Sequence, residues 1–341
     1  MPHYNLAFLG FGNVGKALAE LLLRKQEEIA ARYGTFSVTG IATGRHGIAI
    51  DPGGIDLRRA IDQVNAGGSL QVISRSSPPC TGILDFIQAC GGQVLFESTP
   101  VNYETGQPAV DYIQAALEAG MHVASANKGP VVHAYRELTA LAAARGRKFY
   151  FESAVMDGAP VFGLYRETLP AAQITAFRGV LNSTTNLILS RMETGESFED
   201  AVRYAQSIGI AETDPSGDVD GWDAAVKVSA LATVWMDIPT QPQQVERTGI
   251  RGIKPEDIAA AKAQGKRWKL VCEARRTGAQ LHAQVSPQMV PSDSPLYGVE
   301  GTSSIVQIES DVLGKLSLLE EDPGPHTTAY GLLADFLNAV R

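Results

Sequence analysis

Short apolar runs alternate with helix-forming segments over roughly the first 150 residues of the chain. The predicted strands are 5–9, 36–42, 93–97 and 122–126, and the predicted helices are 16–32 and 109–119. Strands that alternate with helices in this way are typical of a parallel sheet. The glycine-rich residues 44–54 are expected to form a loop. The pattern therefore predicts an α/β domain with a doubly wound parallel sheet over residues 1–150.

The pattern changes after Phe149, where Gly158, Pro160 and Pro170 interrupt the chain before an apolar strand at 174–181. Further strands, expected to be antiparallel, are predicted at 270–275, 281–285, 305–309 and 316–319. Strands that pair as hairpins, together with separate helices, indicate an α+β domain, here over residues 151–319. The last helix, 327–340, is expected to pack on the first domain, so that residues 320–341 complete it.

Three glycines follow the first predicted strand, in the segment G-F-G-N-V-G that runs from Gly10 to Gly15. In a Rossmann-type dinucleotide fold, Gly10 makes the tight turn, Gly12 lets the backbone approach the pyrophosphate, and Gly15 lets the helix pack closely on the strand. The helix that follows directs free N–H groups at the phosphates. A glycine-rich turn without a ligand is the alternative, but the flanking strand and helix favour a cofactor site that also includes Phe11, Asn13 and Val14.

The choice between NAD and NADP depends on the segment after the second strand. An acidic residue there would bind the ribose hydroxyls, whereas an arginine would accommodate a 2′-phosphate. This chain has Arg45 there and no carboxylate until Asp51. The segment favours NADP slightly over NAD, although Arg45 could equally be a solvated loop residue.

One lysine stands in an almost wholly apolar segment. Residues 224–236 predict a helix buried on most sides, and Lys227 is its only charged residue. Burial of an ammonium group is costly, and Asp223, four residues earlier on the same helix face, can offset part of that cost. A surface ion pair is the alternative. A partly desolvated lysine has a lowered pKa, which suits proton transfer to a developing alkoxide.

Two further features surround this chemistry. Glu212, Asp214, Asp218 and Asp220 form an acidic loop that could bind a divalent metal, bind a substrate ammonium group, or simply be solvated. Lys128 follows the predicted strand 122–126 at its carboxyl end, which is the edge where open α/β sheets place ligands. An ordinary loop lysine is the alternative there.

Composition and charge exclude several classes. The net charge of -8 argues against nucleic acid or an anionic membrane as a partner, and a small-molecule substrate is expected instead. The chain has no apolar run long enough for a membrane span. Three cysteines without a C-x-x-C pair fit reduced thiols in a cytoplasmic protein, and the six histidines lack the spacing of a zinc hydrolase.

At these residues the sequence resembles the homoserine dehydrogenase family. The matching segments are G-F-G-N-V-G, S-A-N-K at 125–128, E-S-A-V-M-D-G-A-P from Glu152, G-V-L-N-S-T-T-N from Gly179, and the acidic block that ends at Lys227. They follow in order along nearly the whole chain. The resemblance implies a short form, without a C-terminal regulatory domain, of an enzyme of amino-acid biosynthesis that reduces L-aspartate 4-semialdehyde to L-homoserine with NAD(P)H.

The resemblance also implies roles for individual residues. Lys227 would be the main acid/base and Lys128 a helper near the nicotinamide. The substrate would be bound by Glu212, Asp218, Asp223 and Thr184, and the cofactor also by Thr99, Ser125 and Lys128. A monovalent cation, usually Na⁺, would lie at Glu152 and the backbone carbonyls of Val155, Asp157 and Ala159, since oxygen ligands suit a hard cation. A homodimer through the sheet of the second domain is implied as well.

Two other functions remain open from the residues alone. One is another amino-acid dehydrogenase, such as an aspartate dehydrogenase, which substrate profiling would separate. The other is a non-catalytic NAD(P)-sensing protein, against which the buried Lys227 argues.

Overall fold

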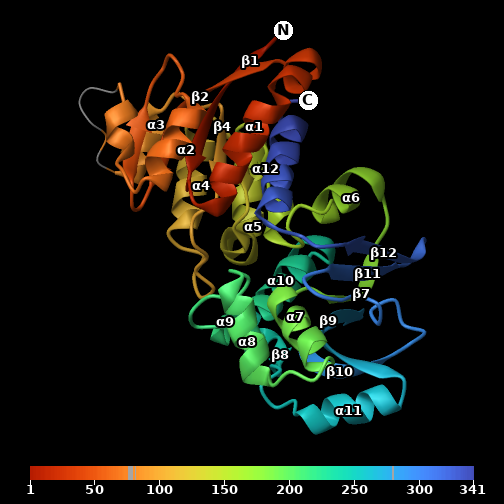
Figure 1. Cartoon of the computed structure of the whole chain (residues 1–341). Coiled ribbons are helices and arrows are strands. Elements are labelled where there is room, and N and C mark those ends of the chain that lie inside the picture. The colour runs from red at the N-terminus through yellow and green to blue at the C-terminus, as the bar shows by residue number, and fades with distance from the viewer. Residues whose placement is uncertain (76–79, 81, 279) are drawn as a thin grey trace. The chain divides into compact units, whose positions relative to one another are not determined.

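The computed structural model describes residues 1–75, 80, 82–278 and 280–341. The chain forms two compact units (Figure 1). Unit 1 comprises Met1–Pro160 together with Gly324–Arg341, and unit 2 comprises Val161–Pro323. Among the helices of the described residues, none combines the length and the apolar character that crossing a bilayer requires.

The sheet of unit 1 has the strand order β3-β2-β1-β4-β5-β6. Its strands are β1 (His3–Leu9), β2 (Thr35–Thr43), β3 (Gly47–Ile50), β4 (Val94–Glu97), β5 (His122–Ser125) and β6 (Phe149–Tyr150). All neighbouring strands are parallel except β2 and β3. The order reverses direction between β1 and β4, so this unit is the predicted Rossmann-type doubly wound sheet.

The helices of unit 1 connect these strands and supply most of its core. They are α1 (Asn13–Arg32), α2 (Leu57–Asn65), η1 (Leu70–Ile73), α3 (Ile83–Ala89), α4 (Ala109–Glu118), α5 (Lys128–Ala144), η2 (Glu152–Ala154) and α12 (Pro325–Ala339). Leu18 and Leu22 of α1 are fully buried in one cluster with Leu6 and Phe8 of β1. The alternation of apolar runs along the sequence therefore produces a continuous core between sheet and helices.

The expectation of a loop over residues 44–54 is wrong in part, because residues Gly47–Ile50 form β3. This strand pairs antiparallel with β2, and the turn between them is closed by a hydrogen bond from the His46 N–H to the Thr43 Oγ1, at 2.7 Å. Ile48 and Ile50 are buried. Alternating apolar residues within a glycine-rich segment thus formed an edge strand whose side chains extend the core.

The last helix, α12, belongs to unit 1 although almost the whole of unit 2 precedes it in the chain. It packs along α1, and Phe336 is fully buried. The Phe336 ring meets the rings of Tyr4 and Phe96 edge to face, with centroids 5.8 and 6.0 Å apart. Burial of such rings contributes about 2–3 kcal/mol each, which ties the end of the chain to its first strands.

Unit 2 is built on a second sheet, with the order β12-β11-β7-β9-β10-β8. Its strands are β7 (Ile174–Val180), β8 (Glu246–Arg247), β9 (Lys266–Thr277), β10 (Gln280–Pro291), β11 (Ser304–Ser310) and β12 (Gly314–Glu320). Its helices are α6 (Val161–Thr168), α7 (Ser183–Met192), α8 (Phe198–Ser207), α9 (Ser216–Val219), α10 (Trp222–Trp235), η3 (Pro242–Gln244) and α11 (Pro255–Ala263). All neighbouring strands are antiparallel except β8 and β10, so the second region has the predicted α+β character.

Helix α10 lies deep in unit 2, since every residue from Val228 to Trp235 is buried. Gly221, with a φ of 80°, turns the chain into it from α9. The helix packs against β9 and β10, and the Trp235 ring meets that of Phe177 on β7 edge to face at 5.7 Å. The apolar segment around Lys227 is therefore a core helix, as the sequence indicated.

Candidate active site

The three glycines of the opening turn show the geometry of a phosphate cradle. Gly10 has a φ of 99°, and a Cβ on it would lie 2.6 Å from the Ser98 carbonyl oxygen. A Cβ on Gly15 would lie 2.7 Å from the Gly10 carbonyl oxygen, so helix α1 could not approach the turn with a larger residue there. A Cβ on Gly12 would meet nothing within 4 Å. The turn therefore has two positions where a side chain would clash and one that leaves the backbone open, which is the pattern expected of a dinucleotide-binding turn.

The other predicted cofactor residues of this turn have different environments. Phe11 is buried, and its ring packs edge to face on Phe8 at 5.5 Å. Asn13 is the exposed first residue of α1, and Val14 is half-buried. Arg45 is exposed in the turn after β2. Phe11 thus supports the turn from the core, whereas Asn13 and Arg45 lie on the surface at the ends of the two strands.

The ends of β1, β4 and β5 lie side by side at one edge of the sheet, because Leu9 pairs with Glu97 and Glu97 with Ser125. Glu97 is fully buried there and accepts hydrogen bonds from the Thr99 N–H at 2.8 Å, the Thr99 hydroxyl at 2.5 Å and the Ser125 hydroxyl at 2.6 Å. Burial raises the pKa of Glu97, and these donors oppose that rise. Thr99 and Ser125, both predicted to bind the cofactor, are therefore joined through one carboxylate.

Lys128 lies at the same edge, as the first residue of α5. Asn127 caps this helix by accepting the Gly129 N–H at 3.0 Å, and its amide nitrogen donates to Glu97 at 3.5 Å. The Lys128 ammonium lies 6.0 Å from the centre of the Tyr103 ring. Glu97 and Asn127 therefore fix the backbone from which Lys128 projects.

Lys227 is the centre of the polar cluster in unit 2. Its side chain is only 13% exposed, and its Nζ lies 3.1 Å from Asp223 Oδ2. The same ammonium donates a hydrogen bond to the Leu181 carbonyl oxygen at 2.6 Å. A charge that is largely removed from water thus has a carboxylate and a carbonyl as partners, which is how buried ammonium groups are stabilised.

The carboxylates around Lys227 come from two helices. Asp223 lies in the first turn of α10 and Asp218 in α9. The Asn182 amide nitrogen donates to Asp218 Oδ1 at 2.7 Å and to Asp223 Oδ2 at 2.9 Å. Burial and the Asp223 charge raise the pKa of Asp218, while hydrogen bonds from Asn182 and Thr184 and the Lys227 charge lower it. The structure therefore brings together four of the predicted site residues, namely Lys227, Asp223, Asp218 and Thr184.

The remaining acidic residues of the predicted loop are exposed or have partners outside this cluster. Glu212 is exposed before α9. Asp214 accepts the Ser216 N–H at 3.0 Å and so shapes the turn into α9. Asp220 pairs with Arg251 at 2.5 Å. Within the described residues, no group of three His, Cys, Asp or Glu side chains could hold a metal ion, so the acidic loop gives no support to a divalent site.

The segment predicted to bind a monovalent cation has an unusual backbone. Glu152 is buried in η2, and its N–H donates to Asp335 Oδ2 at 2.8 Å. Met156 and Asp157 have φ angles of 57° and 48°, which residues other than glycine seldom adopt. Asp157 also accepts a hydrogen bond from the Thr328 hydroxyl at 3.1 Å. The loop is therefore held in a strained conformation by contacts with α12.

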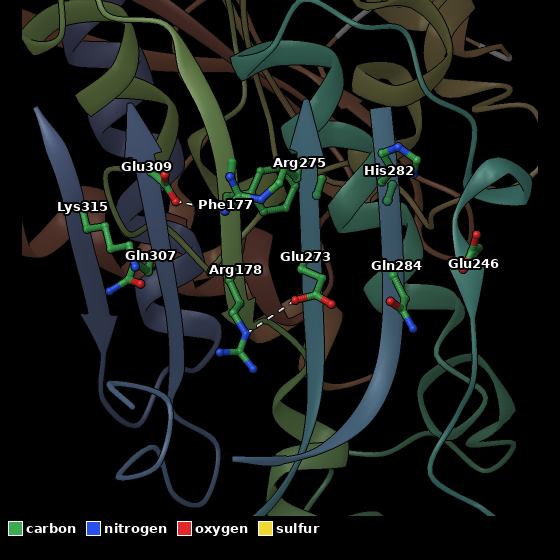
Figure 2. A pocket seen from close by; sticks show the side chains of 13 residues that line it. Phe177, Arg178, Glu246, Glu273, Arg275, His282, Gln284, Gln307, Glu309 and Lys315 are labelled. Carbon is green, nitrogen blue, oxygen red and sulfur yellow. Dashed lines mark hydrogen bonds and ion pairs between the residues drawn. The ribbon is translucent and has the colours of Figure 1, made fainter. Parts of the chain in front are cut away.

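A separate hollow of about 540 Å³ lies on the sheet of unit 2 and contains none of the predicted site residues. Figure 2 shows its charged and polar side chains standing on one face of the strands. Arg178 of β7 pairs with Glu273 of β9 at 3.6 Å, and Arg275 of β9 pairs with Glu309 of β11 at 3.0 Å. This face is a charged surface rather than an enclosed site.

Comparison with known protein families decides what these two sites belong to. The family model for homoserine dehydrogenase matches residues 160–337, and the model for the homoserine dehydrogenase NAD binding domain matches residues 10–152. The chain belongs to the homoserine dehydrogenase family. The resemblance to this family that the sequence motifs indicated is confirmed.

Individual homoserine dehydrogenases are similar over their whole length. The chain is 33% identical to an NAD(+)-dependent homoserine dehydrogenase of Pseudomonas canavaninivorans, with 99% of this chain and 96% of that protein covered. It is 35% identical to a homoserine dehydrogenase of Methanocaldococcus jannaschii, with 98% of each covered. A hyperthermophilic archaeal homoserine dehydrogenase in complex with NADPH is 30% identical with a TM-score of 0.83, and 99% and 98% of the chains are covered.

These similarities establish a homoserine dehydrogenase, an oxidoreductase that acts on a CH–OH group and contains an NAD(P)-binding domain. They favour neither an aspartate dehydrogenase nor a non-catalytic sensor.

Sequence reasoning missed three residues of this homoserine dehydrogenase that hold the site together. Glu97, Asn127 and Asn182 each bind at least two of the predicted residues or their neighbours. The two asparagines stand directly before helices, so the preference of asparagine for the N-cap position was an available signal. Glu97 had a weaker signal, as a carboxylate that ends an apolar strand.

Proposed function

We propose that this homoserine dehydrogenase catalyses the reversible NAD(P)H-dependent reduction of L-aspartate 4-semialdehyde to L-homoserine, with Lys227 as the acid/base. The supporting observation is the environment of its ammonium, 13% exposed and held by Asp223 and the Leu181 carbonyl. A bound nicotinamide supplies the hydride to the aldehyde carbon. Lys227 gives a proton to the aldehyde oxygen as negative charge develops there, and takes one from the hydroxyl in the reverse direction.

The acidic residues near Lys227 are suited to the other end of the substrate. We assign the substrate ammonium group to Asp218 and Glu212, and the orientation of Lys227 to Asp223. Thr184, which hydrogen-bonds to Asp218, fixes one side of this carboxylate. Charge-assisted hydrogen bonds from an ammonium to carboxylates are among the stronger polar contacts, and they fix the distance between the bound group and the reacting carbon.

We assign the cofactor to the edge of unit 1. The pyrophosphate would lie against Gly10, Gly12 and Gly15, where the backbone is open only at Gly12. Thr99, Ser125 and Lys128 would line the nicotinamide end. The Ser125 side chain is fully buried against Glu97, so its contribution is to hold the strand ends in place. Arg45, exposed after β2, favours NADP over NAD.

We also assign a monovalent cation, Na⁺, to Glu152 and the backbone carbonyls of Val155, Asp157 and Ala159. The strained backbone at Met156 and Asp157 supports this assignment, because a reversed loop of this kind can gather carbonyl oxygens. The test compares the melting temperature of the protein in NaCl and in choline chloride at equal ionic strength. A bound Na⁺ should raise the melting temperature in NaCl. Equal stability in the two salts, for wild type and for Glu152→Gln, would contradict the proposed cation site.

A homodimer through the face of the unit 2 sheet is the assembly we propose. The face carries both Arg178 and Arg275 and both Glu273 and Glu309, so two copies related by a two-fold axis could pair opposite charges (Figure 2). Sedimentation equilibrium should give twice the 36.3 kDa chain mass. Arg275→Glu should shift the protein to monomer, whereas Arg203→Glu on the exposed surface of α8 should not.

The function itself is tested by substrate profiling. L-Homoserine should be oxidised with production of reduced nicotinamide, followed by its absorbance, with NADP⁺ giving the higher kcat/KM in a parallel assay with NAD⁺. L-Aspartate is the matched alternative substrate. Turnover of aspartate without turnover of homoserine would contradict the proposal, and binding of the cofactor with no turnover of either substrate would indicate a sensor.

A further inference from the structure

Asn182 occupies the position between β7 and α7 and performs two tasks with one side chain. Its Oδ1 accepts the Thr185 N–H at 2.8 Å and so caps α7. This cap fixes which end of the amide is oxygen and which is nitrogen, because only the oxygen can accept an N–H. The amide nitrogen, with its two N–H groups, consequently faces away from the helix.

Both N–H groups of that nitrogen point at carboxylates. The nitrogen lies 2.7 Å from Asp218 Oδ1 and 2.9 Å from Asp223 Oδ2, and Asn182 and Asp223 are 3% and 7% exposed. Two carboxylates that approach one nitrogen so closely repel each other in a site with little water. A neutral group that donates to both lowers this repulsion without adding a charge.

The same short segment also holds the lysine. Leu181, immediately before Asn182, accepts the hydrogen bond from Lys227 Nζ at 2.6 Å. Asp223 Oδ2, which accepts from Asn182, is the oxygen that pairs with Lys227 at 3.1 Å. The ammonium is thus held through the backbone carbonyl of residue 181 and through the carboxylate that residue 182 orients.

Cys272, from β9, is a further titratable group that interacts with Lys227 and Asp223. Burial raises the pKa of its thiol to about 12, so it carries no charge near neutral pH. Charge in the cluster therefore comes from Asp218 of α9 and from Asp223 and Lys227 of α10. Two negative charges against one positive charge leave the carboxylates in need of additional donors, which Asn182 and Thr184 provide.

We propose that Asn182 is a positioning residue of the reaction: its amide keeps Asp218 and Asp223 ionised side by side and thereby keeps the Lys227 ammonium in place. This inference rests on the proposed role of Lys227 in proton transfer. It goes beyond the capping of α7, since a cap requires only the oxygen of the side chain.

The two tasks can be separated by substitution, because serine and aspartate also cap helices well. Asn182→Ser retains a capping oxygen and removes the amide donor. Asn182→Asp retains the size and the cap but turns a third carboxylate oxygen toward Asp218 and Asp223. The matched control is Ser197→Ala, which removes the cap of the neighbouring helix α8 at an exposed site.

We expect Asn182→Ser to lower kcat/KM for homoserine by about tenfold or more and to move the acidic limb of its pH profile upward by about one unit, since the carboxylates then take up a proton more readily. Asn182→Asp should show the larger shift if it folds. Ser197→Ala should lower the melting temperature without moving the pH profile. A wild-type pH profile in Asn182→Ser, with only a lower melting temperature, would overturn the proposal.

A second measurement does not depend on turnover. The side-chain carboxyl carbons of Asp218 and Asp223, observed by ¹³C NMR in the protein without substrate, should titrate at higher pH in Asn182→Ser than in wild type. Unchanged titration would overturn the inference even if activity fell. Shifted titration in a protein that does not oxidise homoserine would instead retain the role of Asn182 and reject the proposed function.

Discussion

Two lysines of unit 2 are partly or fully withdrawn from water, and the fully buried one, Lys269, is not the candidate acid/base. Lys269 of β9 is fully buried, and its ammonium donates to Asn186 Oδ1 at 2.9 Å and to the Val299 carbonyl. Lys227 retains 13% exposure and has Asp223 at 3.1 Å. The proposed acid/base is therefore the lysine that keeps some exposure and pairs with a carboxylate, not the one that is buried more deeply.

The partners of Lys269 explain its role. Asn186, on α7, also donates to the carbonyl oxygens of Gly301 at 3.0 Å and Ser303 at 3.2 Å. Lys269 thus links α7, through Asn186, to the segment that precedes β11. These hydrogen bonds join α7, β9 and the backbone carbonyls of residues 299, 301 and 303. The contact is a tie between elements rather than a proton-transfer site.

Of the substitutions that test the difference between the two lysines, Lys227→Met should have the largest effect. Removal of the group that transfers the proton should lower kcat per folded molecule by about 10²- to 10⁴-fold. The melting temperature should also fall, because Asp223 loses its cationic partner. Steady-state kinetics with homoserine and a thermal scan give both values. Turnover close to wild type in the folded variant would exclude Lys227 from the mechanism and leave the two lysines without a functional difference.

Asp223→Asn should have a smaller effect on the same reaction. The variant keeps the shape of the side chain but removes the charge that holds the ammonium, so we expect kcat/KM to fall by about 10- to 100-fold. Asp214→Asn, at an exposed turn, is the matched control and should retain activity. A loss in Asp223→Asn no larger than in that control would mean that the Leu181 carbonyl alone holds Lys227.

These two lysines also show what sequence alone can and cannot reveal. Lys227 was identifiable because it is the only charge in the apolar segment 224–236, so its withdrawal from water follows from its neighbours in the chain. Lys269 lies in a strand with Lys266 and Arg267 nearby, and that pattern is typical of an exposed edge. Its burial depends on α7 and on the segment near Val299, which come from distant parts of the sequence.

The same reasoning applies to the rest of the fold. The Rossmann-type sheet could be predicted because apolar runs and glycines report on local structure. β3 was missed because its strand character came from pairing with β2. In the site, Lys227, Asp218 and Asp223 were predictable. The cap made by Asn182 had a local signal, but its contacts with the two carboxylates and those of Glu97 with Ser125 did not, because they join residues 28 to 41 positions apart in the sequence.

Lys269→Met should affect stability rather than catalysis. The substitution leaves Asn186 Oδ1 and the Val299 carbonyl without their donor, which we expect to lower the free energy of unfolding by about 1–2 kcal/mol after the gain from no longer burying a charge. Urea denaturation measures this change, and kcat per folded molecule should stay at the wild-type value. A large fall in kcat at unchanged stability would make Lys269 a participant in the reaction and end the distinction drawn here.

The smallest effect is a pH dependence that Lys269 alone should produce. Burial lowers the pKa of Lys269 from 10.5 to about 8, with the nearby Glu193 opposing the shift. Below pH 8 the folded and unfolded chains both hold the proton, so wild type and Lys269→Met differ by a constant free energy. Above pH 8 the unfolded chain still holds the proton and the folded chain releases it, so wild type gains stability relative to the variant, by about 1 kcal/mol at pH about 8.5 to 9.

Urea denaturation of both proteins on either side of pH 8 measures the difference. A constant difference across this range would mean that the ammonium stays charged in the core, and Lys269 would then resemble Lys227 more closely than its contacts indicate.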